Sequence, residues 1–112
     1  MSTELSPRSA LRVRLGLVTD IPAGEGRSYH VDARDIAVFR TRDGHLFATQ
    51  AQCPHRKGPL ADGLLGSQSV VCPLHDKRFD LASGCEVGGA GDCALAVYPV
   101  HVDANELWVE LD

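Results

Sequence analysis

The chain has 112 residues and a mass of 12.0 kDa, which leaves room for one small hydrophobic core and no second one. An apolar content of 44% suits a modest globular fold, which an inserted metal centre would stabilise. The formal net charge of −4 disfavours nucleic acid and anionic membranes as partners. We expect a flexible N-terminus at residues 1–10 and a single domain at residues 11–112.

Membrane and export signals are missing from the sequence. No stretch reaches the roughly 20 consecutive apolar residues that a membrane-spanning helix requires. Residues 1–14 contain several charged side chains and no twin-arginine pair, and they lack the apolar segment of a signal peptide. These features predict a cytoplasmic protein without a membrane anchor.

Short strands separated by turn residues follow one another along the chain. In residues 11–18, arginines alternate with leucine and valine, as in a strand with one solvent-facing side. Asp43-Gly44 is a strong hairpin signal between two apolar segments. The expected strands are residues 11–18, 27–31, 35–40, 45–49, 69–72, 78–81, 95–102 and 106–111. No segment has the pattern of a helix of ten or more residues, so the predicted fold class is all-β, built from small antiparallel sheets.

Two segments between the strands each combine a cysteine with a histidine. Cys53-Pro54-His55 is followed, after 16 intervening residues, by Cys72-Pro73-Leu74-His75. Zinc modules usually pair Cys with Cys and His with His, whereas here the two residue types alternate. Each loop must therefore serve two metal positions, as in a Rieske [2Fe–2S] cluster, where two Cys hold one iron and two His hold the other. The predicted ligands are Cys53, His55, Cys72 and His75, on two loops at one end of the fold.

This ligand set predicts an electron carrier. Two neutral imidazoles in place of two thiolates remove two negative charges, so the cluster accepts an electron more easily. Rieske clusters have potentials of roughly −150 to +300 mV, compared with about −400 mV for plant-type clusters that have only cysteine ligands. The second ring nitrogen of each histidine can also release a proton, which couples protonation to reduction.

Residues around the two loops have expected supporting roles. Pro54 and Pro73 stiffen the ligand turns, and Gly58 and Gly84 allow close approach of the backbone to the cluster. Three apolar residues are candidates for a cover that limits water access, although ordinary loop and core packing would explain them equally well: Leu60, Leu64 and Leu65.

Charged residues and further cysteines and histidines leave alternatives open. The pairs Arg56-Lys57 and Lys77-Arg78 are either solvated loop charges or a docking surface for an acidic partner. Cys85 and Cys93 are expected to be buried thiols, with a disulfide as the alternative. Three histidines each stand alone in the sequence and are expected to have surface or structural roles: His30, His45 and His101.

With these motifs, the chain resembles the Rieske ferredoxins, and most closely the small subunit of assimilatory NAD(P)H nitrite reductase. The resemblance runs from Arg12 to Leu111 and is most specific in residues 53–63 and 71–84. It implies a Rieske-like fold. In nitrite reductase, the large subunit carries flavin, siroheme and a further iron–sulfur cluster and reduces nitrite to ammonium. The resemblance implies that this chain is its electron-transfer or accessory subunit in nitrate assimilation, with no catalysis of its own.

Two other functions fit the same four ligands. Ferredoxins of aromatic-ring dioxygenase systems have nearly the same two boxes and would have a ferredoxin reductase and a terminal oxygenase as partners. The Cys-Pro-His box and the following Gly-Pro-Leu favour nitrite reductase over this alternative. A zinc-stabilised interaction module without redox activity is the third hypothesis. The length excludes a terminal oxygenase, and Gly58 and Leu74 stand where the membrane cytochrome-complex class has bridging cysteines.

Overall fold

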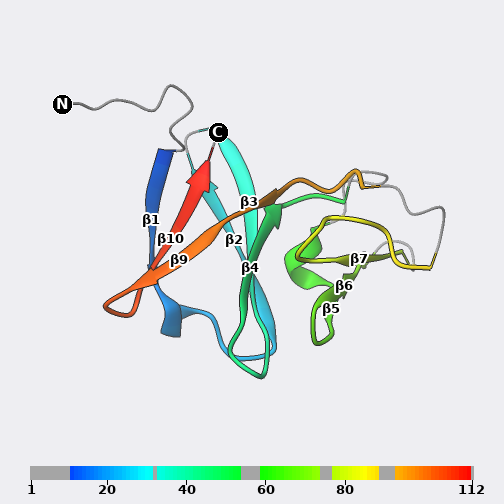
Figure 1. Ribbon diagram of the computed structural model, residues 1–112, viewed down its shortest axis with the longest axis horizontal. Coiled ribbons are helices and arrows are strands. Elements are labelled where there is room, and N and C mark those ends of the chain that lie inside the picture. The colour runs from blue at the N-terminus through cyan, green and yellow to red at the C-terminus, as the bar shows by residue number, and fades with distance from the viewer. Residues whose placement is uncertain (1–10, 32, 54–58, 74–76, 89–92, 112) are drawn as a thin grey trace.

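Three small antiparallel sheets make up the protein and lie side by side in Figure 1. The computed structural model describes residues 11–31, 33–53, 59–73, 77–88 and 93–111. The helical segments in these ranges are two 3-10 turns, η2 (Val18–Asp20) and η3 (Leu60–Asp62). The prediction of an all-β fold of small antiparallel sheets is therefore confirmed. Among the described residues, no helix has the length and apolar character needed to cross a bilayer.

Strand order within each sheet follows from the pairing. The first sheet has the order β1-β10-β9 and contains β1 (Leu11–Leu17), β9 (Val100–Asp103) and β10 (Glu106–Leu111). The second has the order β2-β3-β4-β8 and contains β2 (Glu25–Val31), β3 (Arg34–Arg40), β4 (Leu46–Gln50) and β8 (Val97–Tyr98). The third has the order β5-β6-β7 and contains β5 (Leu64–Leu65), β6 (Ser69–Val71) and β7 (Arg78–Asp80).

Strand β3 is buried on both faces and separates two hydrophobic cores. Successive side chains of a strand point to opposite faces. Ile36 and Val38 belong to the base core, and Ala37 and Phe39 belong to the cysteine-side core. The base core consists of Ile21, Ile36, Val38, Ala48, Leu107, Val109 and Leu111. The cysteine-side core consists of Ala37, Phe39, Cys53, Leu60, Val70, Cys72, Phe79, Leu81 and Leu95. The second sheet is therefore the wall between the first and third sheets.

The single strand predicted for residues 95–102 is divided at Pro99. Before the proline, Val97 pairs with Thr49 of β4 in the second sheet. After it, Val100 pairs with Val109 of β10 in the first sheet. Proline has no N–H to donate to a strand ladder, so the chain can leave one sheet and enter the other at this point. Strand β5 and turn η3 were not predicted, because segments of two and three residues are too short to show a period.

The β9–β10 hairpin has an alanine at a turn position that disfavours it. Ala104 and Asn105 have φ values of 51° and 68°, both in the left-handed region. Two-residue hairpin turns with two positive φ values favour asparagine and glycine, because alanine is strained there. We expect Ala104→Gly to raise the free energy of unfolding by about 0.5–1 kcal/mol in chemical denaturation.

Ala82 provides the control for this substitution. It is an exposed turn residue whose φ is not positive. Ala82→Gly should therefore lower the stability, since glycine only adds conformational entropy to the unfolded chain. Equal changes in the two variants would contradict the explanation by backbone strain.

Candidate metal centre

Cys53 lies at the base of a loop that is closed by backbone pairing. Gln52 and Pro59 form an isolated antiparallel bridge on either side of the loop. The N–H of Leu60 donates to the carbonyl oxygen of Ala51 at 2.9 Å, which continues the pairing. The chain thus leaves the second sheet after β4 and returns beside it. His55, the second predicted ligand of this segment, lies outside the described residues.

Cys72 has the same place in a second loop. It follows β6 directly, and its N–H donates to the carbonyl oxygen of Lys77 at 2.9 Å. Val71 and Arg78, the next residues outward on each side, are paired in the β6–β7 ladder. Both predicted cysteine ligands therefore begin loops with firmly paired ends. His75 lies outside the described residues.

The two cysteines meet in one hydrophobic environment. Cys53 is 1% exposed, Cys72 is 2% exposed, and both belong to the cysteine-side core. Neither of them is part of a disulfide. Phe39 and Phe79 are fully buried in the same core. Two reduced thiols on neighbouring paired loops, in a site shielded from water, suit the thiolate half of a [2Fe–2S] donor set.

The three histidines outside the loops have carboxylate partners. Nδ1 of His30 lies 2.6 Å from Oδ1 of Asp35, and Nδ1 of His45 lies 3.2 Å from Oδ1 of Asp43. His101 pairs with Glu110; this hydrogen bond, together with that from Arg12, outweighs the effect of desolvation and lowers the pKa of Glu110. Within the described part of the chain, no group of three or more histidine, cysteine, aspartate or glutamate side chains could hold a metal ion. These pairs with carboxylates are what surface or structural roles would produce.

Comparison with known proteins decides the family. Residues 13–110 match the family described as Rieske-like [2Fe-2S] domain, which is nearly the whole chain. The chain belongs to this family. A Rieske-type [2Fe–2S] cluster is accordingly its cofactor, and the two buried cysteines of the cysteine-side core fit this cofactor.

Three proteins illustrate the range of Rieske relatives. The biphenyl dioxygenase ferredoxin subunit of Pseudomonas sp. (strain KKS102) is 35% identical over 95 residues, which cover 83% of this chain and 85% of that protein. The ferredoxin of carbazole 1,9a-dioxygenase from Nocardioides aromaticivorans IC177 has a TM-score of 0.81 and 26% identity, covering 90% and 98% of the two chains. A protein named as a nitrite reductase NADPH small subunit has a TM-score of 0.77 and 25% identity, covering 88% and 97%.

The apolar residues beside the first Rieske loop do not all face the cluster side. Leu60 is fully buried in the cysteine-side core, and Leu65 packs against this core. Leu64 is 76% exposed, so its predicted role in an apolar cover is wrong. The reason is the alternation of β5, whose two residues point to opposite faces of the third sheet.

Cys85 and Cys93 form a disulfide, which corrects the expectation that both are buried thiols. Gly84, with a φ of +79°, turns the chain after β7. The N–H of Leu95 then donates to the carbonyl oxygen of Gly84 at 3.2 Å. This contact brings the two flanking cysteines together. The sequence could not show it, because it depends on a backbone contact between residues 11 positions apart.

Asp80 organises the turn that leads to this disulfide. Its carboxylate accepts hydrogen bonds from the Ser83 N–H at 2.9 Å, the Ser83 hydroxyl at 2.8 Å and the Gln68 amide at 2.9 Å. Burial would raise the pKa of Asp80, but these hydrogen bonds outweigh it and hold the pKa below its ordinary value. The Ser83 hydroxyl is therefore committed to a carboxylate.

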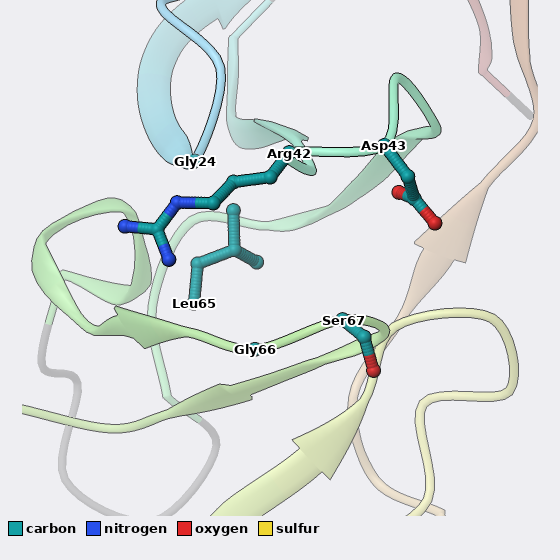
Figure 2. A pocket seen from close by; sticks show the side chains of 6 residues that line it. All are labelled: Gly24, Arg42, Asp43, Leu65, Gly66 and Ser67. Carbon is teal, nitrogen blue, oxygen red and sulfur yellow. The ribbon is translucent and has the colours of Figure 1, made fainter.

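A hollow of about 320 Å³ lies apart from the two cysteines, at the junction of the second and third sheets. Figure 2 shows Arg42 extending from the β3–β4 turn alongside Leu65, while the Asp43 carboxylate points away from the guanidinium. The hollow is lined by Gly24, Arg42, Asp43, Leu65, Gly66 and Ser67. None of these is a predicted ligand. The lining also has no nucleophile paired with a base, which is the arrangement that would indicate an active site.

Proposed function

We propose that Cys53 and Cys72 hold one iron of the Rieske cluster and that His55 and His75 hold the other. The observation that carries this proposal is the burial of Cys53 and Cys72 in one core, each at the base of a paired loop and neither in a disulfide. The chain is a Rieske ferredoxin that transfers electrons. The cluster supplies a one-electron donor and acceptor, while the surrounding apolar side chains exclude water and hold the thiolates in place.

For the partner, a relative in sequence supports an oxygenase system as one candidate. The 35% identical relative is a biphenyl dioxygenase ferredoxin subunit, and the alignment covers most of both chains. We propose that this chain carries electrons from a ferredoxin reductase to a terminal oxygenase. The large subunit of a nitrite reductase is the second candidate, supported by the residues of the first box and by the likeness to a nitrite reductase small subunit.

Reconstitution distinguishes the two partners. Anaerobically loaded protein would be mixed with a purified reductase and terminal oxygenase in one assay, and with a nitrite reductase large subunit in another. We expect faster turnover with the cognate partner and no nitrite reduction by this chain alone, because the proposed role of the chain is to carry electrons to a catalytic partner. Robust nitrite reduction by the isolated chain would overturn the carrier role. Metal analysis tests the zinc alternative: two irons and two sulfides per chain, or one zinc.

The reduction potential is expected near the lower end of the Rieske range. Hydrogen bonds from hydroxyl groups to cluster sulfurs make reduction easier. Ser83 is the nearest hydroxyl residue downstream of the second box, and its hydroxyl donates to Asp80 at 2.8 Å instead. We therefore expect a midpoint on the order of −150 to 0 mV in protein-film voltammetry near neutral pH. A midpoint near the top of the Rieske range would contradict this reasoning.

A further inference from the structure

One face of the third sheet carries a row of exposed side chains. Leu64 pairs with Val71, and Val71 pairs with Arg78. The N–H of Val87 donates to the carbonyl oxygen of Arg78 at 2.8 Å, which places Val87 next in the same row. Directly paired residues of antiparallel strands project from the same face. We call these four residues the outer row, because the opposite face of the sheet lies on the cysteine-side core.

Two of the four side chains in the outer row are both apolar and exposed. Leu64 is 76% exposed and Val87 is 49% exposed. A hollow of about 310 Å³ lies along the row and is lined by Leu64, Leu65, Gly66, Ser67, Ser69, Val71 and Arg78. The other exposed large hydrophobic residues of the described chain, Leu17 and Val102, lie in the first sheet. Leu64 borders this hollow beside two serines and Arg78, whereas Val87 lies outside its lining. Exposed apolar side chains rimmed by polar residues are typical of a surface that binds another protein.

Arg78 adds an available positive charge to the middle of the row. Among the described residues, no carboxylate forms an ion pair with its exposed guanidinium. The neighbouring Lys77 is occupied, because its ammonium lies 3.1 Å from Glu86. The Asp80 carboxylate also has partners, because it accepts hydrogen bonds from Gln68 and Ser83. The guanidinium can therefore take both oxygens of an external carboxylate.

The position of the outer row connects it to electron transfer. Val71 directly precedes Cys72, and Arg78 directly follows the loop that Cys72 begins. In Figure 1, the third sheet lies at the end of the molecule away from the first sheet. A protein bound to the outer row would thus lie beside the second metal loop, while the base of the fold would remain uncovered.

We propose that the outer row is the docking surface for the redox partner. The partner presents an apolar side chain to the hollow beside Leu64 and a carboxylate to Arg78. The apolar contacts hold the complex together, and the charge pair orients it and accelerates its formation. This inference rests on the proposed carrier function and assigns its partner a surface chemistry.

Two matched pairs of variants test the docking surface in cluster-loaded protein. Val87→Asp is compared with Val102→Asp, since these valines are 49% and 51% exposed. Arg78→Glu is compared with Arg27→Glu, another exposed arginine, which lies on β2. The probes are the terminal oxygenase of a biphenyl dioxygenase and a nitrite reductase large subunit. Stopped-flow absorption measures the second-order rate of electron transfer, and hydrogen exchange of the wild type with and without each probe locates the contact.

We expect the outer-row variants to keep their cluster absorption but to transfer electrons at least tenfold more slowly, while the controls stay within twofold of the wild type. Residues 64–71 and 78–87 should gain protection from exchange.

Equal rates in outer-row and control variants, or protection elsewhere, would overturn the docking surface and leave the carrier function standing. If the wild type transferred electrons to neither probe, the carrier function would be overturned, and the docking surface with it. A wild-type homodimer that Val87→Asp dissociates would also overturn the proposal, since a second copy would then fill the row.

Discussion

Replacing Cys53 or Cys72 with serine is expected to abolish the iron–sulfur absorption and EPR signal of anaerobically reconstituted protein. A serine hydroxyl is a much poorer iron ligand than a thiolate, and each cysteine is expected to supply half of the thiolate ligands of one iron. Both side chains are almost fully buried, so no solvent-exposed group can replace them. The iron and sulfide content per chain should fall with the spectrum.

The chain contains its own control for this experiment. Its remaining cysteines, Cys85 and Cys93, are joined in a disulfide and are not available as ligands. The double variant Cys85→Ser/Cys93→Ser should therefore keep its cluster spectrum, although its stability should decrease. If the double variant lost the cluster while Cys53→Ser retained it, the ligand assignment would be wrong.

Substituting Gly84 with alanine is expected to have the largest effect on stability among the glycines with positive φ. A Cβ atom at this position would lie 2.1 Å from the carbonyl oxygen of Leu95, far inside contact distance. The contacted oxygen belongs to the backbone and the Cβ position is fixed by the backbone, so neither atom can rotate away. We expect Gly84→Ala to lower the free energy of unfolding by roughly 3 kcal/mol or more, measured by chemical denaturation.

Gly88 separates the steric effect from the backbone effect. It has the same φ of +79° as Gly84, but a Cβ atom there would meet no atom of the described residues within 4 Å. Gly88→Ala should therefore show only the strain of a left-handed alanine, about 1–2 kcal/mol. Similar losses in the two variants would show that the contact with Leu95 does not determine the requirement for glycine at position 84.

The sequence predicted the features that depend on neighbouring residues. Alternating arginines and apolar residues marked β1, and Asp43-Gly44 marked the hairpin between β3 and β4, whose strands pair as expected. The cysteine boxes were readable for the same reason, because each ligand pair lies within four consecutive residues. The confirmed fold class and the Rieske family both follow from such local patterns.

The features that were missed depend on contacts between distant segments. The division of a predicted strand at Pro99 follows from the presence of two separate sheets, since β8 pairs with β4 in one sheet and β9 pairs with β10 in the other. The Cys85–Cys93 disulfide requires the contact between Gly84 and Leu95. The exposure of Leu64 depends on which face of β5 meets a core, and a two-residue strand has too short a pattern to indicate it.

The burial of β3 on both faces has a consequence for how the protein matures. Its base-core side, with Ile36 and Val38, packs on the first sheet without using any cysteine. Its other side, with Ala37 and Phe39, presents an apolar platform to the segments that carry Cys53 and Cys72. We therefore expect the base core to form without iron and sulfide. The part of the fold that depends on the cluster would then be the third sheet with its two cysteines, so we expect the apoprotein to keep the base core packed.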